Sequence, residues 1–247
     1  MNVTAGVETI EIATNFRGRP EVYHLTLIWD NDGAVLVDTG IPNQLSVIKE
    51  AMMKVGIPFD NLSKIIITHQ DLDHIGGLPE ILNFFPQKID VLATSEEKPY
   101  IQGDQRLLKV TPEFVNQISS LIPAEISEER RKAILNVFNN PPKAKVDQII
   151  ADGDEIPMFG GIIVIHTPGH TPGHISLYHK QSKTLIAGDA LIIEEGRLVE
   201  TDNCVDANLA KKSLKKFLPY DIQTLICYHG GIFKDNVNQS IFDLANS

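Results

Sequence analysis

Residues 69–74 read HQDLDH and place two histidines and two aspartates within six positions. The segment follows an apolar run at 65–67 and precedes a Gly-Gly pair. Imidazole and carboxylate groups are the usual ligands of divalent transition metals. The alternative interpretation is a polar turn in which Asp71 or Asp73 caps the helix that follows. Metal chemistry is favoured if further ligands occur elsewhere in the chain.

Three later segments supply such ligands, and each lies at or just after an apolar, strand-like run. They are TPGHTPGH at 167–174, AGDA at 187–190 and CYHGG at 227–231. Strand ends are positions where a rigid scaffold can bring distant residues together. The candidate ligands are His69, Asp71, Asp73, His74, His170, Asp189 and His229. Seven ligands suit two divalent ions, about 3.5–4 Å apart, that share a bridging carboxylate and a bridging hydroxide.

The elements that must position these residues are strands in both halves of the chain, separated by helices. Between 95 and 146 the charge is higher and helical patterns occupy 112–121 and 127–139, which predicts a helical insertion that caps the active-site cleft. We therefore expect a single α/β domain over 1–247, with two facing sheets flanked by helices. Periodicity alone does not distinguish this arrangement from a doubly wound sheet. Strand patterns occur at 7–13, 21–29, 34–37, 64–68, 89–94, 148–156, 161–167, 174–179, 184–189 and 224–231, and other helical patterns at 43–55, 74–85, 207–217 and 236–245.

Composition and charge narrow the class of partner. The 247 residues are 43% hydrophobic and 22% charged, as in ordinary globular proteins, and the net charge is −10. That charge disfavours nucleic acid or an anionic membrane as the main partner. Two cysteines provide no disulfide framework, and neither a signal peptide nor an apolar run of about 18 residues is apparent. We expect a cytoplasmic protein with a small-molecule substrate, and a homodimer as the default assembly.

Taken together, the four segments resemble the metallo-β-lactamase-fold superfamily. Its members carry HxHxDH after a strand, then a histidine in a PGHT context, an aspartate in a GD context and a last histidine near the C-terminus. LVDTG at 36–40 also resembles a family feature, and the matches follow the family order from about residue 34 to residue 231. TPGHTPGH is nearer to the glyoxalase II and lactonase branches than to the lactamases. The resemblance implies an αββα four-layer sandwich with the metals in a cleft at one edge of the sheets.

The resemblance also implies a role for each residue. Zinc is the expected metal, and Asp73 is expected to orient the nucleophile and carry its proton, with Asp189 as the second catalytic residue. Asp38 would accept a hydrogen bond from a ligand histidine, and His174 would support the site without binding metal. One ion would bind His69, Asp71 and His170, the other would bind Asp73, His74 and His229, and Asp189 would bridge them.

Asp71 departs from the family pattern, which usually has histidine at this position. Three carboxylates and a hydroxide balance the charge of two divalent ions, whereas the usual two carboxylates leave one positive charge. A neutral centre should be a weaker Lewis acid and should shift metal preference from zinc towards manganese or iron. The flavodiiron branch of the superfamily carries a glutamate here and binds iron.

Three functional hypotheses follow. The first is a metal-dependent hydrolase whose bridging hydroxide cleaves a small ester, thioester, lactone or phosphodiester. Many lactonases of this type have a tyrosine shortly after the bridging aspartate, whereas ALIIEEGRL follows Asp189 here, which weakens the lactone assignment. The second is an iron-dependent oxidoreductase, sulfur-dioxygenase-like or di-iron, suggested by Asp71 and Cys227. The third, a non-catalytic metal-binding module, is disfavoured because all seven ligands are present.

Overall fold

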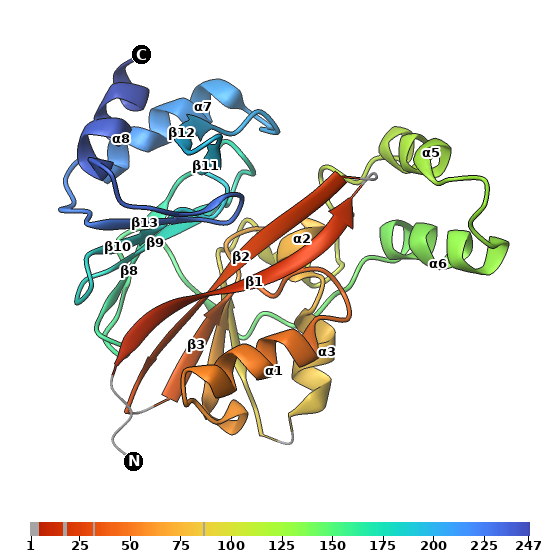
Figure 1. The fold of residues 1–247 in the computed structure, drawn as a ribbon, viewed down its shortest axis with the longest axis horizontal. Coiled ribbons are helices and arrows are strands. Elements are labelled where there is room, and N and C mark those ends of the chain that lie inside the picture. Colours follow the sequence, from red (N-terminus) through yellow and green to blue (C-terminus); the bar gives the residue numbers. More distant parts are fainter. Residues whose placement is uncertain (1–4, 17–18, 32, 86) are drawn as a thin grey trace.

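Two six-stranded mixed sheets form the centre of the computed structural model, which describes residues 5–16, 19–31, 33–85 and 87–247 (Figure 1). The first sheet contains, in spatial order, β1 (Gly6–Phe16), β2 (Arg19–Asp30), β3 (Gly33–Val37), β4 (Leu62–Ile66), β5 (Asp90–Ala93) and β6 (Gln148–Ile149). The second contains β14 (Gly231–Phe233), β13 (Thr224–Cys227), β10 (Thr184–Ile186), β9 (Ile175–His179), β8 (Ile162–His166) and β7 (Glu155–Ile156). A separate hairpin pairs β11 (Leu191–Glu194) with β12 (Arg197–Glu200).

Helices cover the outer face of each sheet. The first sheet carries α1 (Leu45–Lys54), η1 (Phe59–Asn61), α2 (Leu72–Ile75) and α3 (Leu78–Phe84), and the second carries α7 (Ala207–Ser213), η2 (Leu214–Phe217) and α8 (Val237–Asn246). The segment between β5 and β6 contains α4 (Lys98–Ile101), α5 (Pro112–Leu121) and α6 (Glu128–Asn139). Among the described residues, no helix combines the length and the apolarity that a membrane crossing requires.

Strand β3 shows how the sequence produces four layers. All five of its residues are buried. Ala34 and Leu36 pack with the α1 residue Met52, whereas Val35 and Val37 join the cluster between the two sheets. Successive side chains of a strand point to opposite faces, so a short, wholly apolar strand must be covered on both sides. The expected αββα sandwich is confirmed.

The strand directions bring the candidate ligands to one edge. Strands β3, β4, β5 and β6 are parallel, so the segments that follow the first three leave the sheet at the same end. In the second sheet β10 and β13 are parallel, and β9 runs antiparallel to β10. The end of β10, the end of β13 and the loop before β9 therefore meet at one edge of that sheet.

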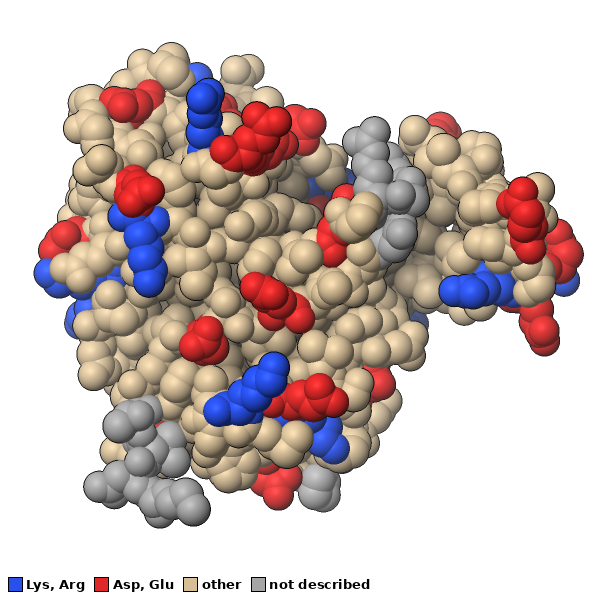
Figure 2. Space-filling view, in the orientation of Figure 1, with Lys and Arg blue, Asp and Glu red and all other residues tan. Residues whose placement is uncertain are grey.

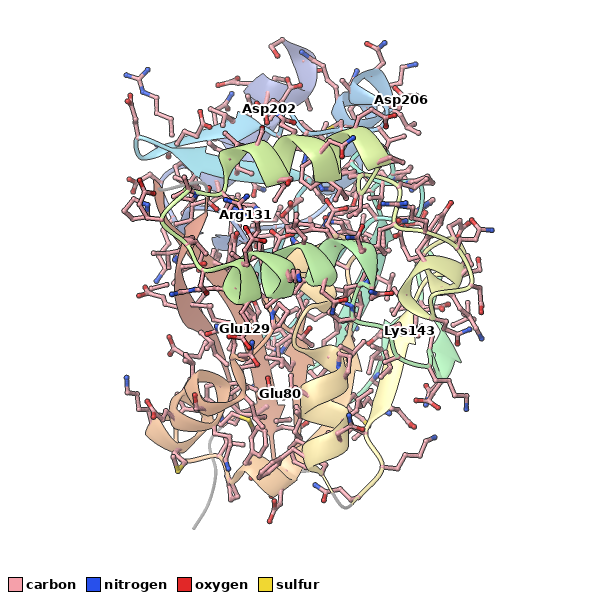
Figure 3. All side chains as sticks on the ribbon, turned by 90° about the vertical axis from the view of Figure 1, so that its right-hand side faces the viewer. Glu80, Glu129, Arg131, Lys143, Asp202 and Asp206 are labelled. Carbon is pink, nitrogen blue, oxygen red and sulfur yellow. The ribbon has the colours of Figure 1, made fainter. Side chains whose placement is uncertain are left out.

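The helical insertion has two parts. Helices α5 and α6 form a hairpin that projects from the sandwich, and both lie where the sequence pattern predicts helices (Figures 1 and 3). Arg131 of α6 fixes this hairpin by donating hydrogen bonds to the carbonyls of Ser119, Ile122 and Pro123. The preceding stretch, residues 97–110, contacts the candidate ligands. Capping of the cleft by α5 and α6 themselves stays a prediction.

The helix predicted over 74–85 is wrong in one respect, because the structure divides it into α2 and α3. Gly76 and Gly77 lie at the break and press against the turn after β3. A Cβ atom at Gly77 would lie 2.4 Å from the carbonyl oxygen of Thr39. The close approach of two backbones, rather than helix propensity, ends α2. The β11–β12 hairpin was not predicted at all.

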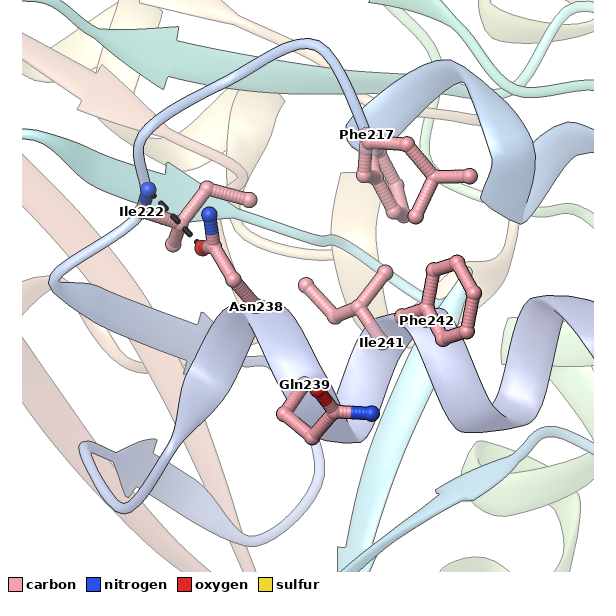
Figure 4. Close-up of a pocket in the computed structure, with 7 residues that line it drawn as sticks. Phe217, Ile222, Asn238, Gln239, Ile241 and Phe242 are labelled. Atoms are coloured by element: carbon pink, nitrogen blue, oxygen red, sulfur yellow. Dashed lines mark hydrogen bonds between the residues drawn. The ribbon is translucent and has the colours of Figure 1, made fainter.

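A surface hollow lies between η2 and α8, away from the candidate ligands (Figure 4). Asn238 borders it and accepts a hydrogen bond from the backbone N–H of Ile222 at 3.0 Å, which ties α8 to the chain before β13. Its lining includes Phe217, Ile241 and Phe242 and none of the predicted ligands. The hollow is therefore a feature of helix packing.

We predict that Gly77→Ala lowers the free energy of unfolding by about 1–3 kcal/mol, because the added methyl group must displace the Thr39 backbone. Urea unfolding followed by circular dichroism measures the change. Gly153→Asn is the comparison variant: its Cβ position is open, so any loss of stability there reflects the backbone φ of +83° and not packing. Equal stability of Gly77→Ala and the wild type would contradict the packing explanation.

Candidate metal centre

Six of the seven predicted ligands form two adjacent groups. In each group, one ligand atom per residue lies within 4.8 Å of the others. Asp189 joins the groups: its Oδ2 lies 3.4 Å from Nε2 of His170 and 3.4 Å from Nε2 of His229. The first group is His69, His170 and Asp189, and the second is Asp73, His74 and His229.

Asp71, the seventh candidate, lies beside the first group. It precedes α2, but its side chain makes no capping hydrogen bond. Its Oδ2 lies 3.4 Å from Nε2 of His69 and 3.1 Å from Nε2 of His170. The helix-capping alternative therefore describes the position of Asp71 in the chain but not the direction of its carboxylate.

Asp38 supports the HQDLDH segment from behind, at the end of β3. Its carboxylate accepts three hydrogen bonds of 2.8 Å, from the backbone N–H and the hydroxyl of Thr68 and from Nδ1 of His74. The Thr68 hydroxyl also lies 3.0 Å from Nδ1 of His69. Because Nδ1 of each histidine is engaged in this network, Nε2 is left to face the site.

Glu97, the residue before α4, links the two ligand loops across the sheets. It is fully buried. Its Oε2 accepts hydrogen bonds from the backbone and side-chain N–H groups of Gln70, both at 2.9 Å. Its Oε1 accepts from the Thr171 hydroxyl at 2.7 Å and from the Gly173 N–H at 2.8 Å. One carboxylate thus sets the distance between HQDLDH and TPGHTPGH.

His174 contacts the main chain of the aspartate between the two groups. Its Nε2 accepts a hydrogen bond from the backbone N–H of Asp189 at 3.0 Å, and its Nδ1 lies 2.8 Å from the Thr167 hydroxyl. A Cβ at Gly188 would lie 2.8 Å from His174 Nε2, so glycine is needed for this contact. His174 therefore fixes the backbone position from which the Asp189 carboxylate projects.

Tyr228 and His229 directly follow β13, and His229 completes the second group. The Tyr228 ring lies 3.8 Å from the His74 ring, centroid to centroid, and its hydroxyl donates to the backbone carbonyl of Asp73. The His229 carbonyl accepts from Ile193 N–H of β11 at 3.0 Å, so the unpredicted hairpin helps to hold this ligand. The side chain of His229 is 34% exposed, whereas that of His69 is fully buried.

The donor atoms at the centre fit divalent metal ions. Among the described residues, the buried side-chain atoms without a hydrogen-bond partner include Nε2 of His69, Nε2 of His74 and Oδ1 of Asp189. Buried polar atoms are normally paired, so three unpaired atoms on residues of the two ligand groups indicate a further partner. Imidazole nitrogen and carboxylate oxygen are suitable donors for zinc, manganese and iron.

Electrostatics favour the metal-binding protonation state at His69 and Asp189. Burial, followed by the charge of His74, lowers the pKa of His69 to about 3, so this ligand is neutral. Burial alone would raise the pKa of Asp189, but His229 and His74 outweigh it and hold that pKa well below its usual range. A neutral imidazole and an ionised carboxylate are the forms that coordinate metals. At His74 and His229 burial alone would lower the pKa, but the Asp189 carboxylate outweighs it and raises the pKa, so metal binding there must release a proton.

Several residues of the site were not predicted. Thr68, Lys109 and Tyr228 contact the candidate ligands, and Glu97 contacts the loops that carry them. Only Thr68 and Tyr228 had a local signal, since each immediately precedes a candidate histidine. The Lys109 ammonium lies 2.6 Å from both Asp71 Oδ2 and His170 Nε2. Glu97 and Lys109 belong to the insertion, and no sequence motif indicates where its side chains lie.

A four-layer sandwich with histidine and aspartate groups at one sheet edge defines a metal-binding class of protein. The model of the metallo-beta-lactamase superfamily matches residues 18–229, and the chain belongs to that family. It is similar to the probable metallo-hydrolase YflN of Bacillus subtilis, with 32% identity over 198 residues, 78% of this chain and 67% of that protein. It is also similar to the hydroxyacylglutathione hydrolase GloC of Haemophilus influenzae, with 24% identity over 72% of this chain and 69% of GloC. The expected membership is confirmed.

A solved structure shows the same fold at low sequence identity. The metallo-beta-lactamase family protein TTHA1429 of Thermus thermophilus superposes with a TM-score of 0.69 at 21% identity, covering 98% of this chain and 78% of that one. The alignments with four Bacillus subtilis relatives cover 58% to 67% of the length of each relative. The relatives support a metal-dependent hydrolase in general terms.

We predict that Asp38→Asn lowers metal affinity by about 10–100-fold, because the hydrogen bonds that orient His74 and Thr68 lose a charged acceptor. Competition with a chromogenic chelator measures the affinity. Asp221→Asn is the control, since Asp221 is 68% exposed and pairs only with Lys183 among the described residues. If both variants bind metal as the wild type does, Asp38 does not support the ligands.

Proposed function

We propose that this protein is a metal-dependent hydrolase with a binuclear centre that cleaves a small ester, thioester, lactone or phosphodiester. The observation that carries the proposal is the convergence of two ligand groups on Asp189, with unpaired buried donor atoms from both groups. Family membership and the names of the relatives support hydrolysis as the reaction class.

Each group would hold one divalent ion, with Asp189 shared between them and Asp71 added to the first. When bound, such ions supply an activated water and polarise the bond to be cleaved. Asp73 is suited to carry a proton: burial and the nearby charge of Asp189 raise its pKa, and its side chain is 26% exposed. The pairing of His74 with Asp38 keeps the histidine oriented while the Asp73 proton moves.

The substrate side of the proposal rests on chemistry and charge. Acidic and basic side chains are interspersed on the face drawn in Figure 2, and the net charge is −10. These features favour a small molecule over nucleic acid or a membrane as the partner. A thioester is the preferred class because GloC is named as a hydroxyacylglutathione hydrolase and the residues after Asp189 form β11, without the tyrosine of the lactonase pattern.

Iron-dependent oxidation is the second candidate, and Asp71 is the observation that favours it. A third carboxylate beside His69 and His170 makes the first group a harder ligand set than three imidazoles would. Cys227, the other residue that suggested redox chemistry, is fully buried in the core of the second sheet. Asp71 alone therefore carries this candidate.

We predict that protein purified without a metal-binding tag contains two equivalents of zinc or manganese and hydrolyses at least one member of a panel of model substrates. The panel contains an S-acylglutathione, an aryl ester, a γ-lactone and an aryl phosphodiester. Chelation should abolish the activity and re-addition of metal should restore it. Asp189→Asn should lower the rate by at least about 100-fold, because it weakens both groups at once.

Elemental analysis and initial rates test this prediction, with Asp221→Asn as a control that should keep full activity. Metal-free protein that hydrolyses a panel member at the wild-type rate would contradict the proposal.

For the iron alternative, we predict that iron-loaded protein consumes no oxygen with a thiol or persulfide substrate. Oxygen uptake that needs iron and disappears in Asp71→His would instead establish the oxidoreductase. An oxygen electrode makes the measurement, and the zinc-loaded protein is the control.

A further inference from the structure

The ammonium group of Lys109 lies against two atoms of the candidate metal centre. Its Nζ is 2.6 Å from Oδ2 of Asp71 and 2.6 Å from Nε2 of His170. The Lys109 side chain is 18% exposed, and that of Asp71 is 12% exposed. Nε2 of an imidazole has one lone pair, so it can accept a hydrogen bond from the ammonium or bind a metal ion, but not both.

The backbone beside Lys109 is attached to the HQDLDH segment. Oε1 of Gln70 accepts a hydrogen bond from the Leu108 N–H at 2.8 Å, while Nε2 of the same amide donates to Glu97. The backbone beside Lys109 is therefore fixed by the hydrogen bond between Leu108, which precedes Lys109, and Gln70, which precedes Asp71. The flexible lysine side chain can leave the ligands while its backbone stays fixed.

The second group has no such competitor in the part of the chain that the structure describes. Among the described residues, the ion pairs of Asp73 are with His74 and His229 only. The lysine contact thus lies on the Asp71 side alone among the described residues. A lysine ammonium needs a carboxylate to hold it, and Asp71 provides this carboxylate at the position where the family pattern has histidine.

We propose that Lys109 is a built-in competitor of the metal ion at the His69, Asp71 and His170 side of the centre. Entry of a metal ion on this side must displace the ammonium from Asp71 and His170. The two sides therefore differ in metal affinity, and the side with Asp73, His74 and His229 fills first. This inference rests on the proposed metal-dependent function.

The test is a metal titration of purified, chelator-treated protein with zinc, followed by calorimetry and by elemental analysis. In the wild type we expect two binding steps of unequal affinity. Lys109→Met should strengthen the weaker step by at least about tenfold and leave the tighter step unchanged, because a competing charge is removed. Lys180→Met is the matched control, since Lys180 pairs with Glu155 at 2.8 Å and not with any predicted ligand among the described residues.

A double-mutant comparison separates direct competition from a general effect of charge. In an Asp71→Asn background the carboxylate that holds the ammonium is absent, so Lys109→Met should change the weaker step much less than in the wild type. Reductive methylation followed by mass spectrometry adds a readout on the lysine itself. Lys109 should be protected in the metal-free protein and reactive after zinc loading.

The outcomes separate the two proposals. Protein that binds two zinc ions, with a weaker step that Lys109→Met does not strengthen, would overturn the competitor role and leave the hydrolase intact. Equal reactivity of Lys109 with and without zinc would overturn it as well. Protein that binds no metal in any variant would overturn the proposed function itself, and this inference with it.

Discussion

The buried carboxylate of Glu97 is the interaction on which the rest of the centre depends. Burying an ionised carboxylate costs several kcal/mol unless hydrogen bonds compensate, and Glu97 accepts four of them. Two come from the loop after β4 and two from the loop before β9, so the carboxylate joins segments that belong to different sheets. Burial still raises the pKa of Glu97 despite these bonds. The unfavourable burial of this carboxylate thus occurs at the position where two ligand loops must keep a fixed separation.

The effect of Asp71 on the charge of the site depends on its contact with Lys109. As a metal ligand, a third carboxylate removes the positive charge that the usual centre retains. The ammonium of Lys109 balances this carboxylate only until a metal ion takes its place, so under the competitor proposal the pair neutralises Asp71 on the side where no metal is bound. Burial alone would raise the pKa of Asp71, but His69, His170 and Lys109 outweigh it and hold that pKa well below its usual range. A departure in the motif is thus coupled to a residue of the insertion.

The sequence was sufficient to predict the layers and the gathering of the candidate ligands at one edge, but not the residues that support them. His69, His170, Asp189 and His229 follow or precede apolar strands, and strand direction determines where such ends meet. Glu97 and Lys109 lie in a segment without periodic pattern, and their contacts join residues 27 to 76 positions apart. The division of the helix at Gly77 has the same origin, because it depends on the Thr39 backbone, a non-local neighbour. Local patterns report periodicity, whereas these features depend on tertiary contact.

The candidate ligands differ in their exposure to solvent, so the centre is open on one side and closed on the other. The side chains of His69 and His170 are 0% and 2% exposed, whereas those of Asp73 and His229 are 26% and 34% exposed. The Lys109 ammonium lies against Nε2 of His170 in the first pair. Solvent therefore reaches the centre at Asp73 and His229. Asp73 is also the carboxylate whose raised pKa suits the proposed proton transfer, so solvent access and that proposed role coincide at one residue.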